Sequence, residues 1–172
     1  MYVRKISFWL ICAALLGVAP HMGLAYFTVG QSAEAMTPQT GLYAVSYEFG
    51  RVKEDMYLPV FAVRGDTATG SKAIGYSIRT EDNTVITNGT AAAIVVANLP
   101  VVNGMYKIEK GKAQKMTLIV FYNKAQTALP AALYHVQVDA LPFFVDYGKG
   151  AFVRQGLNPS ELQYYKTPKL TL

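Results

Sequence analysis

The sequence predicts an all-β protein: an antiparallel two-sheet sandwich preceded by an N-terminal secretory signal peptide. Two observations support the all-β class. Short runs of residues alternate between apolar and polar with period two, which is typical of half-buried strands. Turn residues, chiefly Gly, Asn, Asp and Thr, separate these runs, and no run after residue 30 keeps a helical period beyond two turns. An Ig-like Greek key is the expected topology, with a jelly roll or a small barrel as the alternative.

The first 25 residues have the parts of a signal peptide. A basic start precedes a continuous apolar run at residues 6–19, and Pro20 ends that run. Gly23-Leu24-Ala25 then supplies small residues at the first and third positions of a cleavage site. We expect cleavage after Ala25, with cleavage after Ala35 as the second choice. An uncleaved membrane anchor to about residue 29 is the alternative, although the apolar run is shorter than the roughly 20 residues that a spanning helix needs.

Composition excludes several classes of protein. The chain has 172 residues, and its formal net charge is +5, from 16 Lys and Arg against 11 Asp and Glu. A hydrophobic content of 52% excludes an intrinsically disordered chain. One cysteine excludes a disulfide framework, so the core alone must stabilise the fold. The modest charge without a nucleic-acid motif argues against a nucleic-acid partner, and no nucleotide-cofactor fingerprint is present.

The chain after residue 25 divides into three parts. Residues 26–40 are an N-terminal extension or a first strand, residues 41–148 form the sandwich, and residues 149–172 form a C-terminal tail with one short strand. Within the sandwich, residues 42–49 place Tyr43, Val45, Tyr47 and Phe49 on one face of a half-buried strand. Residues 56–63 form the next run, and Pro59 predicts that this strand lies at an edge, is bulged or is split there.

The remaining runs complete the series. Residues 73–80 alternate, whereas residues 92–99 are apolar on both sides and fit a central strand. Residues 105–108 and 115–122 are the expected arms of a hairpin that bends near Lys110-Gly111. Residues 133–141 and 143–147 are the last runs before the tail. The expected core includes Tyr47, Ile78, Val95, Leu118, Val120 and Val136.

Catalytic constellations are scarce. His135, Gln137 and Asp139 share one face of a strand, and alternation predicts that solvent covers this face. The serines lack the Gly-x-Ser-x-Gly motif of serine hydrolases. The adjacent acids Glu54-Asp55 and Glu81-Asp82 lie in turn-like sequence, where exposed residues are usual. We therefore expect no catalytic residue, no metal ligand and no cofactor.

Two groups of residues are candidates for an interaction surface. Four lysines gather around the expected hairpin: Lys107, Lys110, Lys112 and Lys115. They suit an acidic glycan or a lipid headgroup, or else they protect a strand edge from pairing. Tyr164 and Tyr165 form a candidate recognition pair, with packing of one ring onto the sandwich as the alternative. Asn88-Gly89-Thr90 matches a glycosylation sequon and also suits a tight turn.

Together these features predict an exported, non-enzymatic module with a structural or interaction role, at the cell envelope or outside the cell. It would be periplasmic, attached to the cell surface or extracellular, and its partner would be a protein or a glycan. Membrane contact is expected only through an N-terminal segment that is not cleaved. The first alternative is a small carbohydrate- or lipid-binding module, and the second is a carboxylate- or metal-dependent hydrolase.

Overall fold

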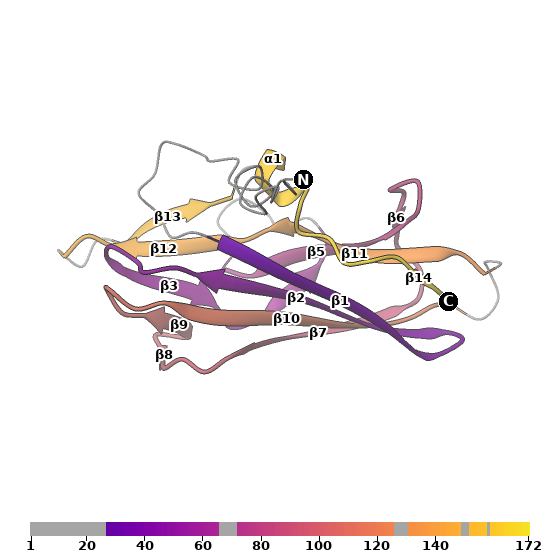
Figure 1. The fold of residues 1–172 in the computed structure, drawn as a ribbon, viewed down its shortest axis with the longest axis horizontal. Coiled ribbons are helices and arrows are strands. Elements are labelled where there is room, and N and C mark those ends of the chain that lie inside the picture. The colour runs from indigo at the N-terminus through magenta and orange to yellow at the C-terminus, as the bar shows by residue number, and fades with distance from the viewer. Residues whose placement is uncertain (1–26, 66–71, 126–130, 149–151, 158) are drawn as a thin grey trace, which may run out of the picture.

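The computed structural model describes residues 27–65, 72–125, 131–148, 152–157 and 159–172 (Figure 1). This part of the chain is all-β, and its strands pair antiparallel except for one parallel pair, β4 with β5. The all-β class predicted from sequence is confirmed. The described strands form three open sheets and do not close into a barrel.

Sheet A has four strands in the order β1-β2-β10-β7. The bounds are Phe27–Thr37 for β1, Thr40–Phe49 for β2, Gln114–Asn123 for β10 and Thr90–Ala97 for β7. β1 and β2 form a hairpin whose register shifts between Ala35 and Thr37. In Figure 1 these long strands run side by side along the molecule.

Two shorter sheets pack against sheet A. Sheet B has the order β13-β12-β3-β9-β8, and sheet C has the order β14-β11-β5-β4 with β6 paired to β5. The bounds in sheet B are Phe152–Gly156 for β13, Pro142–Asp146 for β12, Asp55–Pro59 for β3, Met105–Ile108 for β9 and Val101–Val102 for β8. The bounds in sheet C are Leu170–Thr171 for β14, Leu133–Ala140 for β11, Ile74–Thr80 for β5, Ala62–Arg64 for β4 and Val85–Ile86 for β6. The helical turn α1 spans Pro159–Leu162.

Two segments pass directly between sheets B and C. Leu141 alone separates β11 from β12, and Val60-Phe61 separates β3 from β4. A proline stands at each passage, since Pro142 begins β12 and Pro59 ends β3. Proline cannot donate a ladder hydrogen bond, which favours a break in the sheet at these positions. The predicted split of this strand at Pro59 is confirmed.

One core joins the three sheets. The inner face of β2 supplies Tyr43, Val45, Tyr47 and Phe49, as the alternation predicted. The six core residues expected from sequence are all buried: Tyr47, Ile78, Val95, Leu118, Val120 and Val136. The tail also enters the core through Leu162, Tyr165 and Leu172. Along the sequence, the strands extend beyond residues 41–148: β1 precedes this range, and β13 and β14 follow it.

The predicted hairpin of residues 105–108 and 115–122 is wrong. β9 pairs with β3 and β8 in sheet B, whereas β10 pairs with β2 and β7 in sheet A. The connection between them bonds to Val52 instead: the Gly111 N–H donates to the Val52 carbonyl at 2.8 Å, and the Val52 N–H donates to the Lys112 carbonyl at 3.1 Å. The bend thus carries the chain from one sheet to another.

The predicted signal peptide, residues 1–25, lies outside the described residues. Among the residues that are described, no helix has both the length and the apolar character needed to cross a membrane.

Candidate functional site

Part of the outer face of sheet A is apolar and exposed. The register places Ile119 beside Ile94 and Ala44, and Phe121 beside Ala92 and Leu42. Ile94 is 50% exposed, Val96 is 48% exposed and Phe121 is 37% exposed. We call this surface the apolar face and define it by Leu42, Ala44, Ala92, Ile94, Val96, Ile119 and Phe121. Large side chains gathered in this way on a soluble surface often mark a site of contact with another molecule.

The strand β7, which contributes Ala92, Ile94 and Val96 to the apolar face, contains no charged residue. No charged residue occurs from Asn83 to Tyr106, a stretch that includes all of β7. Among the described strands β7 pairs only with β10, so it is an edge strand. Natural edge strands usually carry charges that prevent pairing with other chains. This uncharged run is the sequence signal that could have identified the surface.

The expectation that residues 92–99 form a central strand is therefore wrong. Ala91, Ala93 and Val95 face the core, but Ala92, Ile94 and Val96 face outward and are exposed. The far edge of β7 is partly occupied, because the Tyr106 hydroxyl donates to the Val95 carbonyl at 3.1 Å. The face of the sheet, more than its edge, is thus the free surface here.

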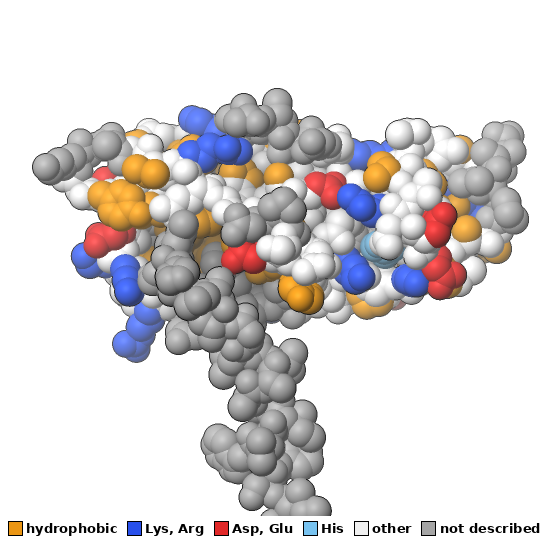
Figure 2. Space-filling model, turned by 90° about the horizontal axis from the view of Figure 1, so that it is seen from above, with side chains coloured by type: hydrophobic (Ala, Val, Ile, Leu, Met, Phe, Trp, Pro, Cys, Tyr) orange, Lys and Arg blue, Asp and Glu red, His pale blue; other side chains and the backbone are white. Residues whose placement is uncertain are grey.

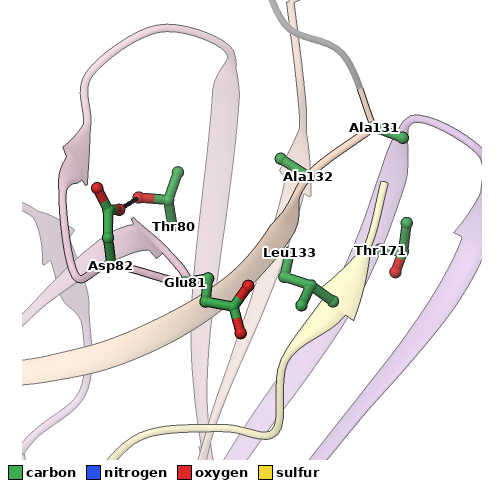
Figure 3. A pocket seen from close by; sticks show the side chains of 7 residues that line it. All are labelled: Thr80, Glu81, Asp82, Ala131, Ala132, Leu133 and Thr171. Carbon is green, nitrogen blue, oxygen red and sulfur yellow. Dashed lines mark hydrogen bonds between the residues drawn. The ribbon is translucent and has the colours of Figure 1, made fainter.

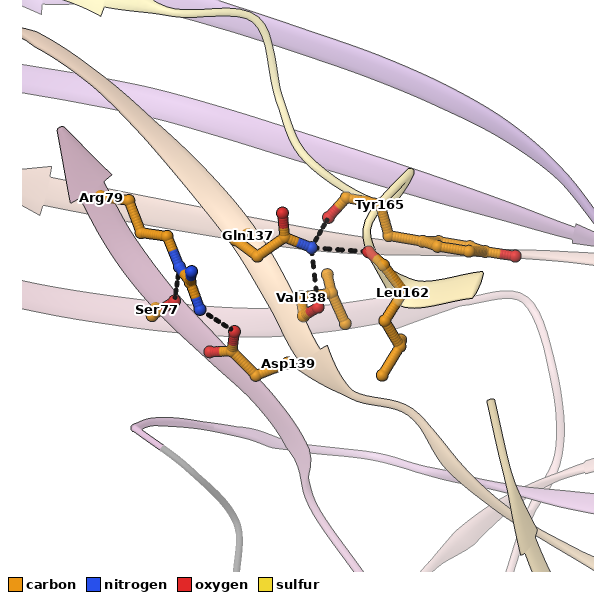
Figure 4. Close-up of polar contacts among 7 residues, drawn as sticks. All are labelled: Ser77, Arg79, Gln137, Val138, Asp139, Leu162 and Tyr165. Carbon is orange, nitrogen blue, oxygen red and sulfur yellow. Dashed lines mark hydrogen bonds and ion pairs between the residues drawn. The ribbon is translucent and has the colours of Figure 1, made fainter. Parts of the chain in front are cut away.

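The outer face of sheet C has the opposite character, because it is polar and buried. His135 is 2% exposed and Gln137 is 9% exposed, so the expectation of a solvated face at these two residues is wrong. The Gln137 side-chain amide donates to the carbonyls of Leu162 and Val138, at 2.6 and 3.0 Å (Figure 4). Asp139, the third residue of this predicted face, is half-buried and bonds Arg79 at 2.8 Å.

The C-terminal tail pairs with the edge of β11, beside this polar face. The Val136 N–H donates to the Thr167 hydroxyl at 3.0 Å, and the Thr167 N–H donates to the Val136 carbonyl at 2.9 Å. Tyr165 is buried and stacks on Tyr47 with ring centroids 5.6 Å apart. Tyr165 is therefore a core residue, whereas its neighbour Tyr164 is 68% exposed. The recognition pair is not formed, and the alternative of one packed ring is correct.

Two of the four candidate lysines are paired with acids. Lys107 lies 2.7 Å from Asp55, and Lys110 lies 3.1 Å from Glu54. Hydrogen bonds from the Lys107 side chain and the Lys110 N–H hold the pKa of Asp55 below its usual range. These pairings reduce the positive charge that an acidic ligand would meet.

The other two lysines do not complete a single surface. Lys112 is exposed in the turn after β9, and Lys115 is exposed on β10 in sheet A, beside Glu48 of β2. Because β9 and β10 belong to different sheets, the four lysines do not lie together on one hairpin.

A shallow pocket lies where the turn after β5 meets the start of β11 and β14 (Figure 3). Glu81 and Asp82 are the two acids in its lining. Asp82 is engaged in its own turn, since it bonds the hydroxyls of Thr80 and Thr84, and these bonds lower its pKa. Glu81 lies 2.9 Å from Lys169. Both carboxylates thus have local partners, and the lowered pKa of Asp82 is the opposite of what a general acid needs.

The described residues contain no group of three or more His, Cys, Asp or Glu side chains arranged to hold a metal ion. Comparison of the sequence with protein-family models found no match, and comparison with curated proteins found no significant one.

Proposed function

We propose that this chain is an exported, non-enzymatic β-sandwich with an Ig-like Greek key, acting as a structural or interaction module at the cell envelope or outside the cell. The single observation that carries the interaction role is the exposed apolar face of sheet A. A solvated sheet face normally alternates to polar residues, whereas this one keeps Ile94, Val96 and Phe121 in water.

Export is proposed from the basic, apolar and small-residue pattern of residues 1–25. The position of β1 favours the first cleavage site over the second. β1 begins at Phe27, directly after the site at Ala25, whereas cleavage after Ala35 would remove most of this strand and its ladder to β2.

The partner class that suits the apolar face is a protein with an apolar surface of its own. Burial of apolar area is the main favourable term in most protein associations, and the face has no charge at its centre to select an acidic ligand. The alternative, a glycan- or lipid-binding module, depends on the four lysines. Two of them, Lys107 and Lys110, form ion pairs with Asp55 and Glu54.

The experiment is site-specific photocross-linking in cells that produce the protein. A photoreactive amino acid replaces Ile94 in the apolar face or, as a matched exposed control, Lys112. We expect a discrete adduct from position 94 and none from position 112. Adding Phe121→Lys should abolish the adduct, because a charge within an apolar contact must be desolvated. Equal adducts from both positions, or none from position 94, would contradict the proposal.

A further inference from the structure

His135 is a buried imidazole without a hydrogen-bond partner. Within the described part of the chain, neither ring nitrogen has a partner, although the residue is 2% exposed. A neutral imidazole offers one donor and one acceptor. Buried polar atoms are nearly always paired, and an exception in a folded protein calls for a specific explanation such as a bound water or ion.

Three basic residues from two elements flank this imidazole. Arg79 of β5 is the direct ladder partner of His135, so the two side chains lie on the same face with Cβ atoms about 5 Å apart. Lys166 of the tail pairs with Gln137, two residues farther along β11, and Lys169 follows in the same segment. In Figure 2 basic side chains (blue) gather around the small area of histidine (pale blue).

The electrostatics of the site agree with this placement. Burial lowers the pKa of His135, and the charges of Lys166, Lys169 and Arg79 lower it further. A positive charge has this effect only when it lies close to the ring. The imidazole of His135 therefore lies close to three basic side chains.

Carboxylates balance only part of this charge. Asp139 lies 2.8 Å from Arg79, and Glu81 lies 2.9 Å from Lys169. Glu161 belongs to α1, which packs on β11. Lys166 is exposed and has no ion-pair partner among the described residues. Arg79 uses its Nε for Ser77 and one Nη for Asp139, so further guanidinium N–H donors remain.

We propose that His135, Arg79, Lys166 and Lys169 form a binding site for an oxyanion of the phosphate or sulfate type. The anion would give the imidazole its missing partner and would meet the unbalanced charge of Lys166. Bound beside the ring, it favours the protonated form, so binding takes up a proton and strengthens as the pH falls. The oxyanion is either a free ion or the same group carried on a small sugar ester.

The test follows the His135 ring by NMR in the full chain, with His21→Asn so that a single histidine reports. Inorganic phosphate, inorganic sulfate and a hexose 6-phosphate are added separately, with sodium chloride keeping the ionic strength constant. We expect each effective anion to raise the pKa of His135, with half-saturation on the order of 1 mM. Equal effects of phosphate and its ester identify the free group as the ligand, and a stronger effect of the ester identifies the ester.

Two variants separate a site from general ionic effects. Lys166→Gln should weaken binding about tenfold, equivalent to ~1.4 kcal/mol, and the matched Lys112→Gln should leave it unchanged. Lys166 is exposed, so its replacement leaves the fold intact. A His135 titration that no oxyanion moves, or one that Lys166→Gln and Lys112→Gln alter equally, would overturn the proposal.

Discussion

The outer faces of sheets A and C break the usual surface pattern in opposite directions. Sheet A exposes large apolar side chains such as Ile94 and Phe121, whereas sheet C buries the polar side chains His135 and Gln137. Both faces lie on the side of a strand that alternates away from the common core. The difference teaches that alternation determines which way a side chain points, but another segment decides whether that face meets water. On sheet C the helical turn α1 contacts this face, where the Gln137 amide donates to the Leu162 carbonyl, and on sheet A no described segment covers the apolar face.

The largest expected effect is a difference in the free energy of unfolding between substitutions on the two faces of one strand. Leu118 and Ile119 are neighbours in β10, but Leu118 is fully buried and Ile119 lies on the apolar face. Leu118→Ala should lower the free energy of unfolding by about 2–5 kcal/mol, through lost transfer energy and a cavity. Ile119→Thr should cost less than about 1 kcal/mol. Urea unfolding of both variants measures the difference, and equal losses would show that the outer face is covered in the monomer.

Gln137→Ala should produce the next largest loss, about 1–2 kcal/mol, because it removes the buried side-chain hydrogen bonds to the carbonyls of Leu162 and Val138. The matched control is Gln163→Ala. Gln163 is exposed, and its amide makes one bond to the Ser160 carbonyl. Thermal unfolding compares the two variants. If the two losses are similar, the helical turn α1 does not contact this face of sheet C in solution.

The pH dependence of stability should report the burial of His135. Its pKa is lower in the folded chain than the ordinary value near 6.5, so the unfolded chain binds more protons between these two values. The free energy of unfolding should therefore be highest above pH ~6.5 and should decrease as the pH falls through this window, by at most about 1.4 kcal/mol per pH unit. Asp55, whose pKa is lowered from 3.8, contributes only at more acidic pH.

Denaturant titrations across this window, with His135→Phe as the comparison, test the assignment. The variant should lose the slope near neutral pH. A slope that persists in His135→Phe would assign the effect to another group.

The smallest expected effect belongs to the apolar face itself. Ile94→Thr should change the free energy of unfolding by no more than about 0.5 kcal/mol, because half of the side chain is already in water. The same change should raise solubility, since it shrinks an exposed apolar patch. Light scattering against concentration measures this, and a large loss of stability would mean that β7 packs against something in the monomer.

Much of the fold followed from the sequence, and the misses have physical causes. The inner face of β2, the core residues and the break at Pro59 follow from local alternation and proline chemistry. The partners of a strand do not, because pairing depends on segments far apart in sequence. This is why β7 was expected in the centre of a sheet and why β9 and β10 were expected to pair with each other.

The candidate site was less predictable. The lysines and tyrosines were chosen by type, but the pairing of Lys107 with Asp55 and the packing of Tyr165 on Tyr47 depend on tertiary contacts. His135 was expected in solvent because nothing in β11 itself reveals which segments of the chain pack beside it.

Cysteine labelling of the two outer faces tests the contrast between them most directly. Ile94→Cys and His135→Cys are made separately in a Cys12→Ser background, with Lys112→Cys as the exposed reference and near-UV circular dichroism as the check of folding. A thiol reagent is added to the native monomer. We predict that the thiol at position 94 reacts nearly as fast as the one at position 112, and that the thiol at position 135 reacts far more slowly than either in the folded chain. Fast labelling at position 135 together with protection at position 94 would contradict the account.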